Sequence, residues 1–263
     1  MLNLRTIHIQ SLEELLKFLD KYSNPTKHIP IKKIAHALFK KKFTETVISY
    51  SYEDSLDIFK HYKSECEAYK IKPVGALVYH FFGVKFDIAD LDKNISYYRG
   101  YCVLRPDGTI SYAMLDEKVI IGEKDSYAYL VCKYPKTIEI MPAIKVPITG
   151  FQYTQKDMGI VMCSQSSFIG ICEYWNEKTG INFTTNTAKE INLEAGIKET
   201  EMTQNSNRGL SIFEIFTFLT KQGVHYNHGY YLCDTCDSIK QKRIETNIYS
   251  YVESGFPVCC IVK

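Results

Sequence analysis

The first half of the chain carries helical hydrophobic patterns. In residues 11–20 the leucines recur every three or four positions, and Ser11 and Glu14 have the spacing of a capping box. This combination predicts a helix. The apolar positions of residues 53–69 predict a second helix.

After these helices the sequence pattern becomes typical of β-strands. Residues 97–104 and 109–115 flank a Pro-Asp-Gly turn at residues 106–108, and together they predict a β-hairpin. Further strands are expected near residues 127–132 and 138–141. The mixture of helices and separate strands predicts the α+β class.

The clearest change in the pattern falls near the middle of the chain. Residues 143–150 contain Pro147 and Gly150, and we interpret them as a connection between two units. The sequence therefore predicts a mixed helix and β-hairpin region over residues 1–145, to which it assigns no role, and a second region over residues 146–263.

The second region carries its own helix-start signals. Three Ser or Thr residues are followed, at capping-box spacing, by Glu or Gln: Thr187 with Glu190, Ser211 with Glu214, and Ser238 with Gln241. The helix after Ser211 has one apolar face, formed by Ile212, Ile215, Phe216 and Leu219. Gly223 supplies its stop. The last helix is expected to end near Glu253, and the apolar residues 256–262 predict a buried strand.

The composition suits a folded protein without a strong overall charge. The chain has 263 residues, of which 45% are hydrophobic, and this is enough to fill a core. Its 32 Lys and Arg nearly balance its 30 Asp and Glu, so we expect no nucleic acid as a partner. The lysine-rich residues 27–42 fit either a solvated helix face or a surface for an anionic partner.

The sequence also bears on the compartment. No stretch reaches the ~18 consecutive apolar residues of a membrane span, and the polar start is unlike a secretory signal. We therefore expect a cytoplasmic protein without membrane association, in which the 9 cysteines mostly remain thiols. Each cysteine is then a core residue, a metal ligand or a nucleophile.

Cys163 is the cysteine whose position favours chemistry. Four apolar residues after it share one face of a predicted helix: Phe168, Ile171, Cys172 and Trp175. Cys163 lies ahead of them, at the cap or in the first turn, where unpaired amides and the helix dipole stabilise a thiolate. Cys172 is expected to belong to the packing face. A cysteine near a helix start also fits a role as small hydrophobic filler.

An acyl-transfer site needs hydrogen-bond donors directed at the oxyanion that forms. Gln155 is the candidate side chain, and the backbone amide of Cys163 is the second donor. The residues alone assign no general base.

Four segments resemble a known family. QKDMGIVMCSQSSFIGICEYW resembles the glutamine, spacer and cysteine-led helix of papain-like cysteine peptidases, particularly the bacterial branch that includes bacteriocin-processing peptidases. GLSIFEIFTFLTKQG resembles the helix after the nucleophile in that branch, and YVESGFPVCCIV resembles the strand that leads to its histidine. YRGYCVLRPDGTISYAML resembles a hairpin found upstream of such domains in large bacterial proteins. The resemblance covers residues 97–263.

The resemblance implies a papain-like half-domain that hydrolyses peptide or amide bonds through a thiol. It implies that Cys163 is the nucleophile and Gln155 the oxyanion donor, and that the substrate is a peptide or protein. We expect no metal and no cofactor. In the family the glutamine stands closer to the cysteine, at the position that Asp157 occupies here.

The family's histidine has no counterpart at its expected position. It follows the strand that corresponds to residues 256–262, and the sequence has no residue after Lys263. Three explanations remain open: the chain is a fragment of a longer peptidase, it is a degenerate relative that serves as a non-catalytic binding module, or His225 or His228 acts as the base. We expect the first of these.

Cys233 and Cys236 form a CxxC motif that fits a zinc site, a redox pair or a plain loop. Cys259 and Cys260 do not easily complete a four-cysteine zinc site, because adjacent residues of a strand point to opposite faces. A plain loop is the simplest interpretation, and we predict no metal site. The aspartates of FDIADLDKN likewise fit a polar loop.

Overall fold

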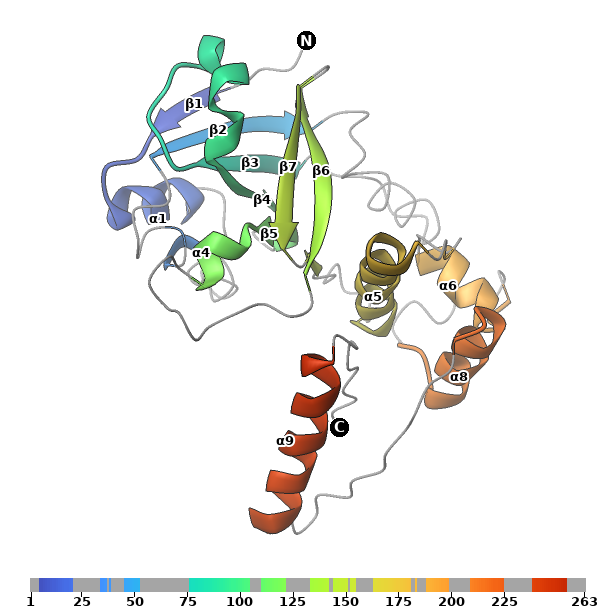
Figure 1. Cartoon of the computed structure of the whole chain (residues 1–263). Coiled ribbons are helices and arrows are strands. Elements are labelled where there is room, and N and C mark those ends of the chain that lie inside the picture. Colours follow the sequence, from blue (N-terminus) through green and yellow to red (C-terminus); the bar gives the residue numbers. More distant parts are fainter. Residues whose placement is uncertain are drawn as a thin grey trace.

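The structure is a computed structural model. It describes residues 5–20, 34–36, 38, 45–52, 76–104, 110–121, 133–141, 144–150, 152–154, 163–180, 183, 188–198, 209–224 and 238–254. These parts form two antiparallel sheets and a set of helices (Figure 1). The predicted α+β class is therefore confirmed.

The larger sheet has six antiparallel strands. In spatial order they are β1 (Arg5–His8), β2 (Thr46–Tyr52), β3 (Ala76–Phe82), β4 (Tyr98–Leu104), β5 (Ile110–Leu115) and β8 (Tyr153–Thr154). The first five strands lie side by side in chain order, and the short β8 extends the sheet beyond β5. The hairpin predicted over residues 97–104 and 109–115 is confirmed, because β4 and β5 pair from Gly100 with Leu115 to Leu104 with Ile110.

Apolar side chains cover both faces of this sheet. Along β3, Tyr79 and Phe81 belong to one buried cluster and Val78 belongs to another. Alternate residues of a strand point to opposite faces, so β3 contributes to two cores at once. Helix α1 (Leu12–Asp20) covers one face and inserts Leu15 into the cluster of Tyr79 and Phe81.

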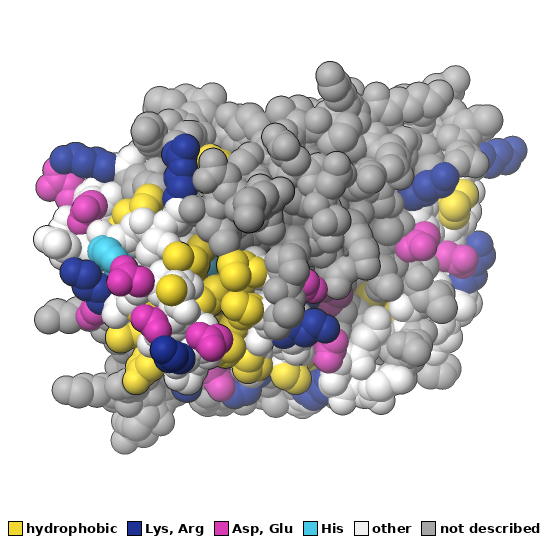
Figure 2. Space-filling model, turned by 90° about the horizontal axis from the view of Figure 1, so that it is seen from above, with side chains coloured by type: hydrophobic (Ala, Val, Ile, Leu, Met, Phe, Trp, Pro, Cys, Tyr) yellow, Lys and Arg dark blue, Asp and Glu magenta, His cyan; other side chains and the backbone are white. Residues whose placement is uncertain are grey.

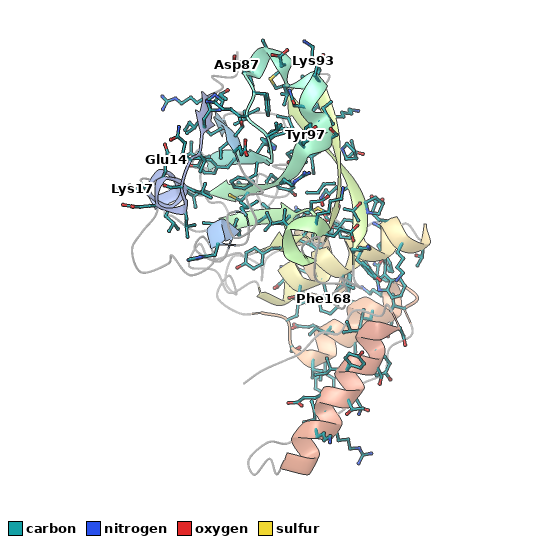
Figure 3. All side chains as sticks on the ribbon, turned by 60° about the vertical axis from the view of Figure 1, so that its left-hand side comes forward. Glu14, Lys17, Asp87, Lys93, Tyr97 and Phe168 are labelled. Carbon is teal, nitrogen blue, oxygen red and sulfur yellow. The ribbon has the colours of Figure 1, made fainter. Side chains whose placement is uncertain are left out.

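The helix predicted at residues 11–20 is confirmed as α1. The Glu14 N–H donates to the Ser11 hydroxyl oxygen at 3.1 Å, and the Glu14 carboxylate accepts from the Gln10 N–H at 2.8 Å. The first bond satisfies an orphan donor at the helix start, and the second ties the preceding residue to the first turn. On the exposed side, where Figure 3 labels Glu14 and Lys17, Lys17 pairs with Glu13 at 2.8 Å.

The smaller sheet is a hairpin of β6 (Tyr134–Met141) and β7 (Ile144–Gly150) that covers the other face of the large sheet. Four of its buried side chains join the cluster of Val78: Ile138, Ile140, Val146 and Ile148. The strand predicted at residues 138–141 is thus part of β6. The interpretation of residues 144–150 as a connection is wrong, and the boundary predicted after residue 145 falls inside β7. The division into two units itself stays a prediction.

Pro147 and Gly150, which suggested that connection, have other roles. Pro147 is exposed in a two-stranded ribbon, where a residue without an N–H is tolerated. Gly150 is buried, and a Cβ there would lie 2.3 Å from the Leu115 carbonyl oxygen. The hairpin can approach β5 this closely only because residue 150 has no side chain.

Two short 3-10 helices, η2 (Ile88–Asp90) and η3 (Asp92–Tyr97), connect β3 to β4 at the surface (Figure 3). The Lys93 amine donates to the Asp90 carboxylate at 2.7 Å. From above, the space-filling view shows apolar side chains gathered beside acidic and basic ones (Figure 2). Charges of both signs share this face.

The other helices follow in chain order: α4 (Glu117–Ile121), α5 (Cys163–Thr179), α6 (Ala188–Glu194), α8 (Ile212–Lys221) and α9 (Ser238–Glu253). The three helices expected from capping-box spacing are confirmed as α6, α8 and α9. In α8 the box is complete, since Ser211 and Glu214 each bond the other's backbone N–H with a side-chain oxygen. The helix ends at Lys221 with Gln222 as its C-cap, and Gly223, whose φ is +69°, follows the cap.

Helices α5, α6 and α8 enclose a third apolar cluster, which we call the helical cluster: Phe168, Ile169, Cys172, Phe183, Ile191, Ala195, Ile215 and Phe218. The predicted packing role of Cys172 is confirmed, because its side chain is buried in this cluster. The predicted face of α8 is correct for Ile215, whereas its other members are half-buried. Phe218, which the prediction omitted, is buried.

Several predicted elements lie outside the described residues. These are the helix of residues 53–69, the turn at residues 106–108, the strand near residues 127–132 and the strand of residues 256–262. Most of the lysine-rich stretch at residues 27–42 also lies outside them. None of the helices that the structure describes has the length and apolar character needed to cross a membrane.

Candidate functional site

Cys163 is the first residue of α5. The sequence predicts this position, because the apolar face of the helix begins only a few residues later. The first backbone N–H groups of a helix have no partner within the helix, and together with the helix dipole they favour a thiolate. The first turn of α5 contains no acidic residue, so no carboxylate of that turn opposes a negative charge.

The other residues of the predicted site lie outside the described part of the chain. These are Gln155, Asp157, His225, His228, Cys233, Cys236, Cys259 and Cys260. The structure therefore does not relate them to Cys163. The oxyanion donor, the general base and the role of the CxxC motif remain predictions from the sequence.

Helix α5 is held from two sides. On one side, Phe168 lies where α5 meets the other helices (Figure 3), and its ring contacts that of Phe218 edge-on at 5.4 Å. On the other side, Tyr174 is fully buried, and its ring lies 6.4 Å from that of Tyr134 in β6. Trp175 packs against both the sheet and the helical cluster. Helix α5 thus joins the helices to the sheet.

A buried amide pair fixes the first turn of α5 to α6. The Gln165 side-chain amide donates to the Asn192 side-chain oxygen at 2.9 Å, and both residues are buried. A buried polar group is stable only when it is hydrogen-bonded, so this bond restricts how the two helices can be placed. Gln165 follows Cys163 by two positions. The pair therefore resists fraying of the turn that carries the thiol.

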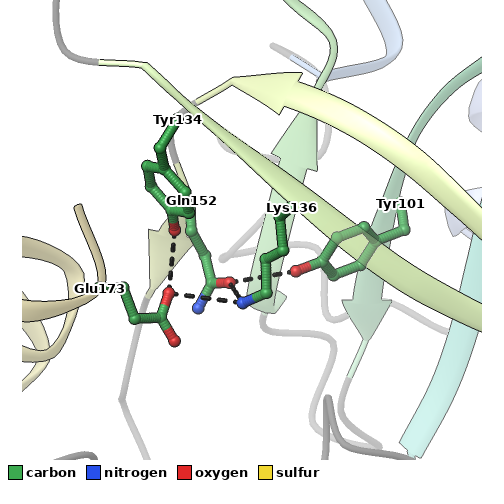
Figure 4. Close-up of polar contacts among 5 residues, drawn as sticks. All are labelled: Tyr101, Tyr134, Lys136, Gln152 and Glu173. Carbon is green, nitrogen blue, oxygen red and sulfur yellow. Dashed lines mark hydrogen bonds and ion pairs between the residues drawn. The ribbon is translucent and has the colours of Figure 1, made fainter. Parts of the chain in front are cut away.

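A charged network fixes the other half of α5 to the sheet (Figure 4). One oxygen of Glu173 accepts from the Tyr134 hydroxyl at 2.9 Å and from the Lys136 amine at 3.4 Å. The Lys136 amine also donates to the Gln152 side-chain oxygen at 2.6 Å. The Tyr101 hydroxyl donates to that same oxygen at 3.2 Å. The network therefore links α5, β6, β4 and the residue before β8.

Both tyrosines of this network remain protonated donors. Burial raises the pKa of Tyr134, and the nearby Glu173 carboxylate raises it further. Burial likewise raises the pKa of Tyr101, with a smaller contribution from the Glu173 charge. The hydroxyls can therefore only donate to Glu173 and Gln152 at ordinary pH. The arrangement positions groups, and it offers no base among its tyrosines.

Neither of these polar contacts of α5 was predicted from the sequence. Gln165 precedes Phe168 and Cys172 by three and seven positions, so helical periodicity placed it on the buried face. Glu173 lies between two buried residues, and a carboxylate there signals a buried partner. The partners themselves, Asn192 and Lys136, carry no local signal.

A second buried polar contact lies inside the sheet. His80 of β3 is fully buried, and its Nδ1 lies 2.9 Å from the Tyr98 hydroxyl. Burial lowers the pKa of His80 to about 3, so the ring is neutral at ordinary pH. Its position in the core makes it a structural group.

Within the described ranges no group of three or more His, Cys, Asp or Glu side chains is arranged to hold a metal ion. Of the aspartates in FDIADLDKN, Asp90 pairs with Lys93 as described above. The thiols of Cys102 and Cys172 are buried in the core. Burial raises the pKa of the Cys102 thiol, which makes it unreactive.

Comparison with protein families, with curated proteins and with solved structures found no match to the chain.

Proposed function

We propose that the chain is a thiol-dependent hydrolase of the papain-like cysteine-peptidase type, in which Cys163 attacks a peptide or amide bond. The observation that supports this proposal is the start of α5 at Cys163. Among the cysteines that the structure describes, Cys102 and Cys172 are buried in apolar surroundings, whereas Cys163 begins a helix. A helix start is the setting that lowers the pKa of a thiol.

The proposed reaction begins with attack of the Cys163 thiolate on the carbonyl carbon. A carbon–sulfur bond forms, and the carbonyl oxygen becomes an oxyanion that accepts from the Cys163 backbone N–H and, by resemblance, from Gln155. The amine leaves after it takes a proton from a general acid, for which His225 and His228 are the candidates in the sequence. Water then hydrolyses the thioester and regenerates the thiol.

The packing of α5 supports this role. A nucleophile must be held in a defined place, because a displacement of about 1 Å can lower the rate about 100-fold. The amide pair of Gln165 and Asn192 holds the first turn, and the charged network of Glu173 holds the second half of the helix. We also propose a cytoplasmic location and a peptide or protein substrate.

Hydrolysis of dye-labelled casein tests the proposal. Because no general base is assigned, the wild-type chain is expected to release dye slowly. Cys163→Ala is expected to abolish this release, since loss of the nucleophile lowers kcat by about 10⁶-fold in a serine protease. Cys172→Ala is the matched control, because it removes a buried thiol of the same helix. Equal rates for wild type and Cys163→Ala, or no release by wild type, would overturn the proposal. The second result would favour a non-catalytic binding module.

A further inference from the structure

The network of Lys136, Glu173, Tyr134 and Gln152 spans the contact between the sheet and the helical cluster. We propose that this network acts as a latch: it fixes the rotation and tilt of α5 on the sheet, and it contributes more to that geometry than to stability. The latch is a property of the fold and does not depend on the proposed function.

The apolar contacts beside the network do not fix the orientation of α5 by themselves. Tyr174 and Trp175 pack against the sheet cluster, but burial of apolar surface is non-directional and tolerates rotation of the helix. Hydrogen bonds prefer a narrow range of distances and angles. Glu173 accepts two donors from the same strand, β6, so the helix cannot rotate or slide without breaking one of these bonds.

Lys136 makes the latch span three elements. Its amine contacts Glu173 of α5 and Gln152 next to β8, and Gln152 in turn accepts from Tyr101 of β4. The side chains of Lys136 and Glu173 are only 26% and 14% exposed. Solvent therefore screens the pair less than it screens a surface ion pair.

The energetics of ion pairs that are largely withdrawn from solvent explain why geometry is the larger contribution. Removing two charges from water costs about as much as their attraction returns, and replacement of a buried pair by apolar residues is often neutral. Loss of only one partner is destabilising, because it leaves a charge uncompensated. An apolar replacement of both charges removes the directional contact, and Tyr134→Phe in the same variant removes the hydroxyl that would otherwise lose its Glu173 acceptor. The free energy of unfolding is then preserved.

Helix α5 carries the other helices with it. It contacts β6 and β8 on one side and α6 on the other, and α8 packs on α6. A change in the rotation or tilt of α5 on the sheet therefore moves the whole helical cluster. Glu173 lies about 15 Å along the helix from Cys163, so a tilt of about 10° around Glu173 displaces the start of α5 by about 2.5 Å. This last consequence concerns the nucleophile only if the proposed function holds.

The same hairpin supplies a matched control. Lys133, just before β6, forms an ion pair with Glu117 of α4. This control pair has the same chemistry as the latch, with a lysine three positions earlier, but Glu117 lies on α4 and not on α5. Its side chains are 40% and 28% exposed.

Fluorescence of Trp175 tests the latch, because this residue is the only tryptophan in the chain and lies on α5 beside Glu173. The latch variant Tyr134→Phe/Lys136→Met/Glu173→Leu is compared with the control variant Lys133→Met/Glu117→Leu. We expect the latch variant to shift the Trp175 emission to longer wavelength and to speed amide hydrogen exchange in α5 about tenfold, with a melting temperature close to that of the control. Glu173→Gln, which keeps a hydrogen-bond acceptor, is expected to be intermediate.

Two results would overturn the latch. One is a latch variant with the Trp175 emission wavelength and the α5 amide exchange rates of the wild type. This would show that apolar packing alone fixes the orientation of α5. The other is a latch variant that unfolds at a much lower temperature than the control, which would make the network a source of stability and not of geometry. Neither result bears on casein hydrolysis, so failure of the latch and failure of the proposed function are distinguishable.

Discussion

The sheet and the helical cluster are held together in different ways. The large sheet has an apolar cluster on each face, one covered by the β6–β7 hairpin and the other by α1. The helices α5, α6 and α8 share one smaller cluster, and α5 is the element that attaches them to the sheet. The sheet is thus specified by apolar packing, whereas the placement of the helices depends on a few polar contacts of α5.

Those polar contacts also differ in kind. Gln165 and Asn192 form a neutral pair inside the helical cluster, whereas Lys136 and Glu173 form a charged pair between the cluster and the sheet. The first holds one helix to another, and the second holds the helices to the strands. Because the two pairs join different elements, we expect that substitutions can break either pair without breaking the other.

Truncation of the helical cluster is expected to have the largest effect. Phe168→Ala removes a buried ring that packs on Phe218, and we expect it to lower the free energy of unfolding by about 3–5 kcal/mol. Urea denaturation measures this change. Phe213→Ala on α8 is the control, because that side chain is 78% exposed and should change stability by less than about 0.5 kcal/mol. Similar effects of the two variants would contradict the packing described for the cluster.

Acid is expected to destabilise the protein through His80, a buried residue of the large sheet. The pKa of His80 is about 3 in the fold and 6.5 ordinarily, because burial disfavours the charged ring. The neutral ring therefore contributes stability that is present above pH 6.5 and is lost as the pH falls from 6.5 towards 3. Its ring neighbours, Tyr98 and Tyr101, carry no charge there to compensate a proton.

His80→Gln isolates this contribution, since it keeps a hydrogen-bond partner for Tyr98 without a group that titrates near neutral pH. Melting temperatures between pH 7 and pH 4 should fall less steeply for His80→Gln than for the wild type. Parallel curves for the two proteins would show that His80 is not the acid-sensitive group of the sheet.

The amide pair should show a smaller effect with a distinctive pattern. Asn192→Leu removes the acceptor of the buried Gln165 amide, and we expect a cost of about 1–3 kcal/mol. Adding Gln165→Met replaces both polar groups by apolar ones and should recover most of that loss. A double-mutant cycle measured by thermal unfolding checks this. Additive losses would mean that the two side chains do not stabilise each other.

Local signals in the sequence were sufficient for elements that depend on neighbouring residues. The capping box of Ser211 and Glu214 predicted α8, and the turn at residues 106–108 predicted the β4–β5 hairpin. Strand β7 was missed because Pro147 and Gly150 resemble the residues of a linker. Only the approach of β7 to Leu115 explains why residue 150 is glycine.

Contacts between distant segments were beyond the reach of sequence patterns. Lys136 and Glu173 are 37 positions apart, and Gln165 and Asn192 are 27 apart. Neither pair belongs to a motif, and each forms only because the fold brings two elements together. The sequence located Cys163 at a helix start through local periodicity, but periodicity does not identify the groups that act with it.

The pKa of the Cys163 thiol shows whether the start of α5 activates this cysteine as a nucleophile. The rate of iodoacetamide alkylation at Cys163 is measured between pH 5 and pH 10 by mass spectrometry of the peptide that contains it, with Cys172 as the internal reference. We expect Cys163 to react with an apparent pKa at least about one unit below the ordinary value near 8.5. An apparent pKa at or above this ordinary value, or alkylation of Cys163 as slow as that of Cys172, would contradict this expectation.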